Sequence, residues 1–404
     1  MPLATRIDGG VTTPRGFKAS GVAAGIKKAE GALDLSVIAA DSIVPAAAVF
    51  TTNKAKAAPI LLSERHLQQS GGRARAVVVN SGCANACTGE TGMAHAKQMA
   101  GDTAAALQCK PEDILVASTG VIGVQLPIAR VSTGIGAAVR ALSIEGSASA
   151  ARAIMTTDPF PKMCAAIAGD GAARITVGGM AKGSGMIEPR MATMLGFLTI
   201  DASIEPHILG EALRNAVNET FNAITVDGEC STNDCVFAMA SGTSGVRVTR
   251  ADDPVLRAAL VEVAGHLARE IVRGGEGATT LVTVRVTGAA TYDDAWLAAR
   301  TIANSPLVKT AINGGDPNWG RLIAAAGRSG AAFVLDGASV SIGPVHLFVR
   351  GVPHDELASE AATYLEQDAV DITVDLGTGG SYAATMWTCD FSAEYVRINA
   401  EYRT

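Results

Sequence analysis

The sequence predicts a mixed α/β fold in which sheets and helices pack in layers. Hydrophobic residues make up 48% of the 404 residues and charged residues 18%, so the chain can bury a large core. Aromatic residues make up only 4%, whereas glycines number 44, so small aliphatic side chains do most of the packing. Apolar runs of strand character alternate with stretches of helical periodicity, which is typical of a layered sandwich. A chain of this length is expected to form two or more packed units.

Strands are expected where short apolar runs are bounded by turn residues. These runs are 76–80, 114–118, 173–178, 193–200, 235–240, 280–286, 332–335, 339–342, 346–349 and 371–376. The segment 332–349 predicts two adjacent hairpins, with turns at Asp336-Gly337 and Gly343-Pro344. The order of the strands does not follow from this pattern.

The clearest helix is expected at 254–273. One face of this stretch carries apolar side chains at helical spacing, namely Leu256, Leu260, Val263, Leu267 and Ile271. Pro254 suits a first turn, and the glycines that follow residue 273 end the helix. Further helices are expected at 292–304 and 355–367.

Charge and cysteine content narrow the class of protein. The net charge is -6 and no basic run occurs, so nucleic acid is not an expected partner. No apolar stretch reaches the roughly 18 residues that a membrane helix needs. Residues 1–10 lack the pattern of a secretory signal, so a cytoplasmic protein is expected. The seven cysteines have irregular spacing without histidines at zinc-binding distance, so buried free thiols are expected rather than a metal site.

The most informative stretch is the glycine-rich segment 177–202, VGGMAKGSGMIEPRMATMLGFLTIDA. Four glycines within eight residues let the backbone approach another segment or a ligand closely. Lys182 lies among them, but the order Lys-Gly-Ser and the strand expected to follow resemble a phosphate-binding loop only loosely. Taken alone, Thr193 is an ordinary residue at the start of a strand.

The segment GMAKGSGMIEPRMATML resembles the processing site of the glutamate and ornithine N-acetyltransferases, the ArgJ family. The resemblance covers nearly the whole chain, through NSGCANACTG at 80–89, ASTGVIG at 117–123, AIMTTD at 153–158, DGECSTND at 227–234, GGEGATT at 274–280, NSPLVKTAINGGDPNWGR at 304–321 and YVRINAEYRT at 395–404. So many ordered matches make a chance resemblance negligible. The resemblance implies a four-layer αββα sandwich of the DmpA/ArgJ-like type, with a smaller C-terminal α/β unit at approximately 285–404.

The resemblance implies that the protein cuts its own Ala192–Thr193 bond, giving an alpha chain, 1–192, and a beta chain, 193–404. A threonine hydroxyl is a weak nucleophile without an adjacent base. The cut creates an α-amine on Thr193 with a reference pKa of about 7.7 to 8.0, which can take the hydroxyl proton at working pH. Thr193 is therefore expected to be both the cleavage point and the nucleophile.

The resemblance also implies the residues around the nucleophile. The hydroxyl of Thr119 and the backbone N–H of Gly120 are implied to form the oxyanion hole; a plain turn after a strand is the alternative. The implied substrate-binding residues are Thr156, Lys182, Thr193, Glu276, Asn399 and Thr404. A lysine and a glutamate would read the carboxylate and the distal ammonium of ornithine, whereas otherwise both would be solvated loop charges. Thr404 stands where the family carries serine, and it keeps the hydroxyl.

The implied reaction moves an acetyl group from N2-acetylornithine to L-glutamate through an acetyl-Thr193 enzyme, without a metal or organic cofactor. Acetyl-CoA is a second donor in bifunctional members, and no residue decides whether it is used here. An α2β2 heterotetramer is implied. Two other classes stay open: a hydrolase, since related sandwiches include self-cleaving aminopeptidases, and a non-enzymatic protein that binds a small anion in its glycine-rich loops. None of the six histidines falls in these motifs, which disfavours a serine-histidine-acid triad.

Overall fold

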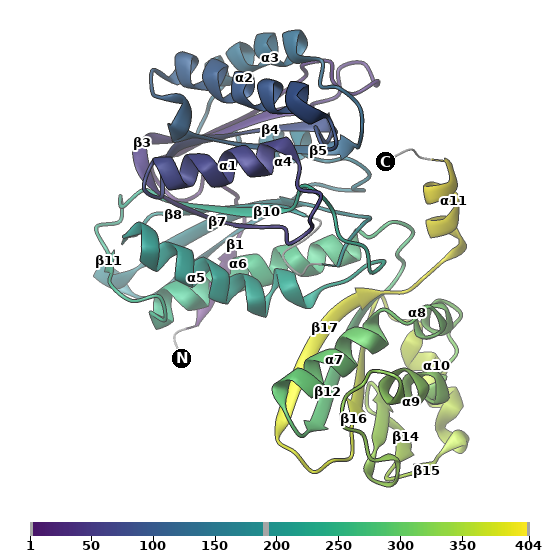
Figure 1. Ribbon diagram of the computed structural model, residues 1–404. Coiled ribbons are helices and arrows are strands. Elements are labelled where there is room, and N and C mark those ends of the chain that lie inside the picture. Colours follow the sequence, from purple (N-terminus) through teal and green to yellow (C-terminus); the bar gives the residue numbers. More distant parts are fainter. Residues whose placement is uncertain (1–2, 189–193, 402–404) are drawn as a thin grey trace. The chain divides into compact units, whose positions relative to one another are not determined.

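The computed structural model describes residues 3–188 and 194–401 (Figure 1). The chain forms two compact units. The large unit is built from the described parts of Met1–Asn222 and from Glu229–Ile271. The small unit is built from Ala223–Gly228 and the described part of Val272–Arg403.

Two sheets of the large unit share one long strand. The first, here the β4 sheet, contains β2 (Phe17–Val22), the first half of β3 (Leu35–Phe50), β4 (Arg73–Cys83) and β5 (Ile114–Val121). The second, here the β8 sheet, runs in the order β1 (Ala4–Ile7), β6 (Lys162–Ala168), β7 (Ile175–Lys182), β8 (Leu195–Ile200), β10 (Cys235–Ala240) and the second half of β3. A separate two-stranded ribbon consists of β9 (Ser203–Ile204) and β11 (Arg247–Val248).

The two sheets pack face to face over a common apolar core. Val77 and Val79 of β4 belong to this core, whereas Val78 between them faces the other way. This alternation is that of a strand whose successive side chains point to opposite faces. On the facing sheet Phe197 stacks on Phe237, with ring centroids 5.9 Å apart. Because β4 is buried on both faces, its sequence is a continuous apolar run.

Helices cover the outer face of the β4 sheet (Figure 1). They are α1 (Ala58–Gln69), α2 (Gly89–Leu107) and α3 (Ile128–Arg140). The side chains that join this layer to the sheet include Val78, Leu62, Met99 and Ile135. A short helix, α4 (Ser147–Ala153), packs instead against β2 and β3 and contributes Ala150 and Ala151 to the core between the sheets.

The outer face of the β8 sheet is covered by α5 (Pro206–Glu219) and α6 (Pro254–Arg273). The predicted helix at 254–273 is confirmed, and the apolar stripe that predicted it is fully buried. The helix lies so close to β7 that a Cβ on Gly179 would stand 2.7 Å from Cγ1 of Val263. The four layers, helix, sheet, sheet and helix, confirm the predicted αββα sandwich.

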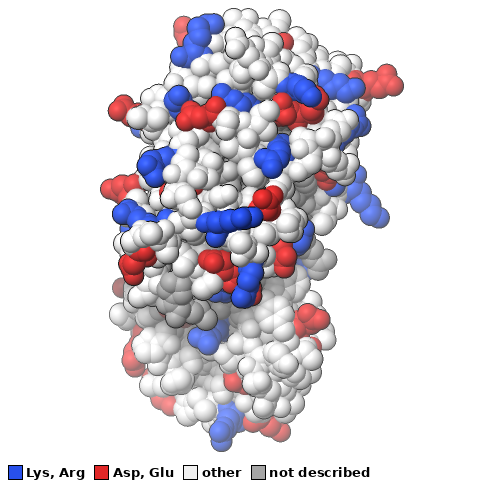
Figure 2. All heavy atoms as spheres, turned by 90° about the vertical axis from the view of Figure 1, so that its left-hand side faces the viewer, with Lys and Arg blue, Asp and Glu red and all other residues white. Residues whose placement is uncertain are grey.

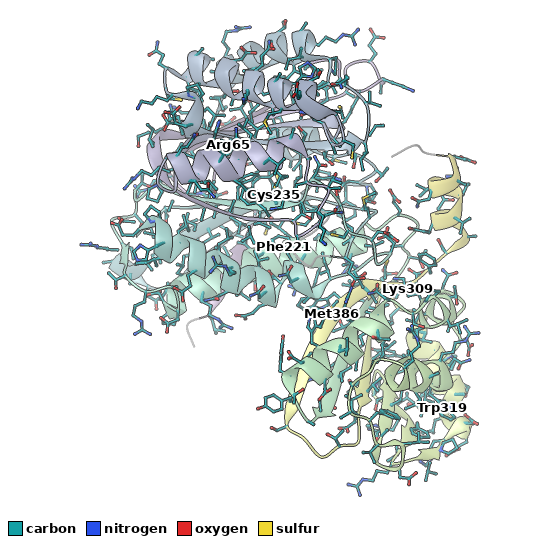
Figure 3. The ribbon with its side chains drawn as sticks, viewed as in Figure 1. Arg65, Phe221, Cys235, Lys309, Trp319 and Met386 are labelled. Atoms are coloured by element: carbon teal, nitrogen blue, oxygen red, sulfur yellow. The ribbon has the colours of Figure 1, made fainter. Side chains whose placement is uncertain are left out.

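The small unit has a six-stranded sheet with its own core. The strands run in the order β15 (Val352–Pro353), β14 (Val345–Val349), β13 (Ser339–Ile342), β16 (Ala369–Asp375), β12 (Leu281–Ala289) and β17 (Tyr382–Cys389). The helices are α7 (Tyr292–Ala303), α8 (Pro306–Asn313), α9 (Trp319–Gly327), α10 (Ala358–Leu365) and α11 (Ala393–Glu401). Trp319 of α9, labelled in Figure 3, stacks on Phe348 of β14 with centroids 4.9 Å apart.

One of the two predicted hairpins is wrong. β13 and β14 form the hairpin around Gly343-Pro344, but 332–335 is not a strand. Bonds from the Gly337 N–H to Val334 and from the Ala338 N–H to Leu335 close a 3-10 turn over Leu335–Gly337. The other 3-10 turns are Pro111–Asp113, Gly171–Ala173, Phe221–Ala223 and Asp355–Leu357.

All seven cysteines lie in the described residues and are free thiols. Four are buried as expected, but Cys87 is exposed and Cys109 and Cys230 are half-buried. Within 3–188 and 194–401, no helix combines the length and apolar character that a membrane span requires. On the face drawn in Figure 2, acidic and basic side chains are interspersed.

Candidate active site

The predicted oxyanion residues lie at the carboxyl end of β5 in the large unit. β4 and β5 run parallel here, with Ser81 beside Thr119 and Gly82 beside Gly120. Gly120 has a φ of +126°, and a Cβ at this position would overlap the Gly82 backbone. Only glycine fits such a close approach of two strands. The backbone of this turn is therefore fixed by steric contact with the neighbouring strand.

The buried amide side chains of Asn80 and Asn233 hold the ends of β4 and β5 through hydrogen bonds. The Ser118 hydroxyl donates to Oδ1 of Asn80 at 2.6 Å, and Nδ2 of Asn80 donates to the Cys83 carbonyl at 2.9 Å. Nδ2 of Asn233 donates to the carbonyls of Ser118 and Ala84, at 2.9 and 2.6 Å. The segments 80–89, 117–123 and 227–234, which are separate motifs in the sequence, thus meet at one place in the large unit.

Asp158 brings Thr156 and Lys182 together. Its Oδ2 accepts the Thr156 N–H at 2.9 Å and lies 4.0 Å from Nζ of Lys182. Its Oδ1 accepts Nζ of Lys162 and the N–H of Gly183, both at 2.7 Å. Thr156 is half-buried, and Lys182, the last residue of β7, is only 8% exposed. Lys182 is therefore not a solvated loop charge.

The electrostatics of this cluster favour an anionic ligand. Burial alone would raise the pKa of Asp158, but the charges of Lys182 and Lys162, together with hydrogen bonds from the Lys162 ammonium and the Thr156 N–H, hold it well below its usual range. Burial lowers the pKa of Lys162, and the adjacent carboxylate opposes that change. Two lysine side chains face this one carboxylate, so Lys182 can also pair with the carboxylate of a substrate.

The cluster around Asp158 and the ends of β4 and β5 lie close together. The Ser81 hydroxyl donates to the Ala153 carbonyl at 2.6 Å, three residues before Thr156. Lys27 packs over Gly82, and its charge interacts with those of Asp158 and Lys182. Four of the predicted site residues are described in the large unit, and they lie at the same end of the sandwich. They are Thr119, Gly120, Thr156 and Lys182.

Glu276 and Asn399 are neighbours in the small unit. Nδ2 of Asn399 donates to Oε2 of Glu276 at 2.9 Å. Glu276 is 7% exposed, so it is not a solvated loop charge either. The next residue, Gly277, has a φ of +70° and leaves no room for a Cβ, which would stand 2.5 Å from the Tyr395 nitrogen. The carboxylate of Glu276 is thus held by the segment that leads to the C-terminus.

Asp390 fastens the loop that carries Glu276. Its Oδ1 accepts the N–H groups of Thr279 and Thr280 at 2.7 and 2.9 Å, and its Oδ2 accepts Nδ2 of Asn313 at 2.6 Å. Nearby, the buried Lys309 (Figure 3) donates to Oγ1 of Thr388 at 2.8 Å. The motifs 274–280 and 304–321 therefore meet within the small unit.

Three of the predicted residues, Ala192, Thr193 and Thr404, lie outside the described residues. Met194 is described, and its carbonyl accepts the N–H of Cys235 at 3.1 Å. Asp158 and Asp234 also lie in the motifs, but the motifs imply no role for either residue. The sequence feature that could have marked them is that each is the acidic residue that ends a motif, AIMTTD for Asp158 and DGECSTND for Asp234.

The fold and the clustered motifs define the class: an αββα sandwich of the DmpA/ArgJ-like type. The ArgJ family matches residues 18–404, and the chain belongs to this family. It is 51% identical over 402 residues to the arginine biosynthesis bifunctional protein ArgJ of Symbiobacterium thermophilum, which covers 98% of this chain and 99% of the relative. The protein of the same name from Chlorobium chlorochromatii is 50% identical over 392 residues, with 97% and 91% covered.

Solved structures also match. The ornithine acetyltransferase of Mycobacterium tuberculosis, complexed with ornithine, is 42% identical, with a TM-score of 0.43, and the match covers 46% of this chain and 98% of that chain. The arginine biosynthesis bifunctional protein of Bacillus halodurans is 36% identical, with a TM-score of 0.44, over 47% of this chain and 98% of that chain.

Proposed function

We propose that the protein is the acetyltransferase of arginine biosynthesis that moves an acetyl group from N2-acetylornithine to L-glutamate. Membership of nearly the whole chain in the ArgJ family carries this proposal. The fixed turn at Gly120 and the buried ammonium-bearing side chain of Lys182 support it, because they suit an oxyanion and a substrate carboxylate.

Self-cleavage prepares the nucleophile. The Thr193 hydroxyl attacks the Ala192 carbonyl, the C–N bond breaks, and the Thr193 nitrogen leaves as an amine. Water then hydrolyses the resulting ester, which frees the alpha chain, 1–192, and regenerates the hydroxyl at the start of the beta chain, 193–404. Both steps pass through a tetrahedral oxyanion, for which Thr119 and Gly120 supply the donors.

Acetyl transfer then uses the new amine as the base. It takes the hydroxyl proton while the oxygen of Thr193 attacks the acetyl carbonyl of N2-acetylornithine. The C–N bond breaks, the proton passes to the leaving nitrogen, and ornithine departs from an acetyl-Thr193 enzyme. The neutral α-amine of glutamate attacks the acetyl carbonyl, the C–O bond to Thr193 breaks, and a proton from the attacking nitrogen passes to the Thr193 oxygen, which restores the free hydroxyl.

The remaining site residues bind the substrate. Lys182 binds the carboxylate shared by donor and acceptor, and Glu276 binds the distal ammonium that only ornithine carries. Thr156, Asn399 and Thr404 complete the set of contacts. The word bifunctional in the relatives' names supports acetyl-CoA as a second donor. We further propose an α2β2 assembly in the cytoplasm, with the small α/β unit belonging to the beta chain.

The experiment that tests the proposal combines intact mass measurement with an assay of donors and acceptors. Purified protein is expected to give two chains, the second beginning at Thr193, and to form N-acetylglutamate from N2-acetylornithine and glutamate. Release of acetate without acetylglutamate would favour a hydrolase instead. An uncut 41.1 kDa chain without activity would favour a binding protein.

A further inference from the structure

Asp390 is a buried carboxylate of the small unit that the proposed reaction does not use. It directly follows β17 and is 2% exposed. Its Oδ1 accepts the N–H groups of Thr279 and Thr280 at 2.7 and 2.9 Å. Its Oδ2 accepts the hydroxyl of Thr279 at 2.7 Å and Nδ2 of Asn313 at 2.6 Å. An ionised carboxylate only accepts hydrogen bonds, so one side chain holds all of these donors in place.

The loop that Asp390 holds is a tight turn, and Glu276 lies at its corner. The Ala278 N–H donates to the Gly275 carbonyl at 3.0 Å, which closes a four-residue turn. Gly277 has a φ of +70°, which is typical of the third residue of a type II turn. Thr279 follows the turn directly, so its bonds to Asp390 fix the end of the turn. The direction of the Glu276 side chain therefore depends on where Asp390 holds the chain.

Helix α8 supports Asp390 from its other side. Lys309 (Figure 3) and Asn313 are four residues apart and lie on the same face of the helix. The Lys309 carbonyl accepts the N–H of Phe391 at 3.2 Å, and Nδ2 of Asn313 binds Asp390 itself. The motif 304–321, whose chemistry the resemblance leaves open, thus holds the two residues that follow β17.

We propose that Asp390 is a positioning residue for the ammonium of the substrate, because it holds the turn that presents the Glu276 carboxylate. This inference rests on the proposed function, which assigns the distal ammonium of N2-acetylornithine to Glu276. A carboxylate on a loose turn must be ordered when the ligand binds, and that ordering costs free energy. Fixing the turn in advance therefore favours a substrate with a distal cation. A substrate without that cation gains nothing from it.

The test compares two acetyl donors on Asp390→Ala. N-acetylnorvaline has the carbon chain of N2-acetylornithine but lacks the distal ammonium. The readout is the rate at which each donor acetylates the cut enzyme, measured against donor concentration. In Asp390→Ala the half-saturating concentration of N2-acetylornithine is expected to rise about 10-fold, the effect of one hydrogen bond to a charged group. The maximal rate is expected to change less than about 2-fold, because the contact is made equally in the ground and transition states.

N-acetylnorvaline separates positioning from a general structural role. Its half-saturating concentration is expected to be the same in Asp390→Ala as in the wild type, because Glu276 has no ammonium to bind. If Asp390 only kept the small unit folded, its loss would weaken both donors alike. Equal weakening of the two donors therefore overturns the inference, as does a wild-type enzyme that binds the two donors equally well.

Asp390→Asn separates positioning from a direct attraction between Asp390 and the substrate. The asparagine keeps one oxygen for the N–H groups of Thr279 and Thr280, and the Asn313 amide can turn so that its oxygen accepts from the new amide. Asp390→Asn is therefore expected to recover most of the N2-acetylornithine binding that Asp390→Ala loses. A loss in Asp390→Asn as large as in Asp390→Ala would assign the effect to charge and overturn the positioning role.

Asp375→Ala is the matched control for stability. The Asp375 carboxylate also holds a loop of the small unit, because it accepts the N–H of Gly377 at 2.8 Å and the hydroxyl of Thr287 at 3.1 Å. None of these residues lies in the 274–280 loop. Asp375→Ala is expected to lower Tm and to keep the wild-type half-saturating concentrations of both donors. A selective loss of N2-acetylornithine in this variant as well would overturn the assignment to Asp390.

Asn313→Ala covers the case in which Asp390→Ala does not fold. Asn313 is exposed and contributes one of the bonds to Asp390. The half-saturating concentration of N2-acetylornithine is expected to rise about 2-fold to 4-fold, the effect of one ordinary hydrogen bond, while that of N-acetylnorvaline stays unchanged. Unchanged binding of both donors in Asn313→Ala overturns the inference. Wild-type protein that takes no acetyl group from N2-acetylornithine refutes the proposed function itself, so the two failures are distinguishable.

Discussion

Replacing Asp158 by asparagine is expected to destabilise the large unit strongly. The side chains of Asp158 and Lys162 are both 0% exposed, and their 2.7 Å contact is a buried ion pair. The substitution leaves Lys162 without its counter-charge and weakens the 4.0 Å attraction to Lys182. Removing one partner of a buried pair costs about 3 to 5 kcal/mol, because the other charge stays buried. In a unit of this size that loss lowers Tm by roughly 10 °C.

Thermal unfolding followed by circular dichroism measures this effect, with Asp252→Asn as the control. Asp252 pairs with Arg250 at the same 2.7 Å, but both side chains are about 70% exposed, so no measurable change is expected. The folded-state pKa of Asp158 is lowered, so its stabilisation is present above the unfolded-state pKa of about 3.9 and is lost as the pH falls further. The contribution of the ionised Asp158 carboxylate to the difference should therefore be equal at pH 7 and pH 5. A loss in Asp158→Asn no larger than in Asp252→Asn would refute the reasoning.

Four further predictions concern the chemistry. Thr193→Ala is expected to remain a single inactive chain by intact mass; normal cutting would contradict the assigned bond. N2-acetylornithine alone should acetylate the beta chain and release ornithine, because a covalent intermediate separates two half-reactions; release only with glutamate present would rule this route out. Thr119→Ala should lower the turnover of fully cut enzyme about 10²-fold to 10³-fold, and unchanged turnover removes that hydroxyl from the mechanism. Lys182→Met should raise KM for both substrates, whereas Glu276→Gln should raise it more for N2-acetylornithine, since glutamate carries no distal cation; equal changes for both substrates in Glu276→Gln would disprove its ammonium contact.

The periodicity of apolar residues predicted those helices and strands in which each face has the same surroundings along the whole element. The helix α6 and the strand β4 were found because each has a regular apolar pattern. The long strand β3 was not predicted, because it bends between two sheets. Its register shifts between Ala39 and Val44, where the sequence carries Asp41 and Ser42, and Pro45 follows. Such polar and proline residues normally end a strand.

The clustering of site residues is harder to predict, because their partners are distant in sequence. Asp158 lies 4.0 Å from Lys182 across 24 residues, and the Cys235 N–H donates to the Met194 carbonyl across 41 residues. Family motifs marked both segments, but only the folded chain shows which charges face each other. The same holds for Glu276, whose contact with Asn399 joins segments 123 residues apart.

The order of strands in the β8 sheet determines whether the two chains produced by a cut before β8 stay together. β8 lies between β7 and β10, and β10 lies between β8 and β3, so two strands from after the cut sit inside a sheet made otherwise from residues before it. The two polypeptides cannot separate without breaking two ladders of backbone hydrogen bonds, β7 with β8 and β10 with β3, and exposing the apolar core. Once unfolded, however, they are two molecules. Refolding of the cut protein is then a second-order reaction whose rate depends on concentration, whereas the uncut chain folds at a rate independent of dilution.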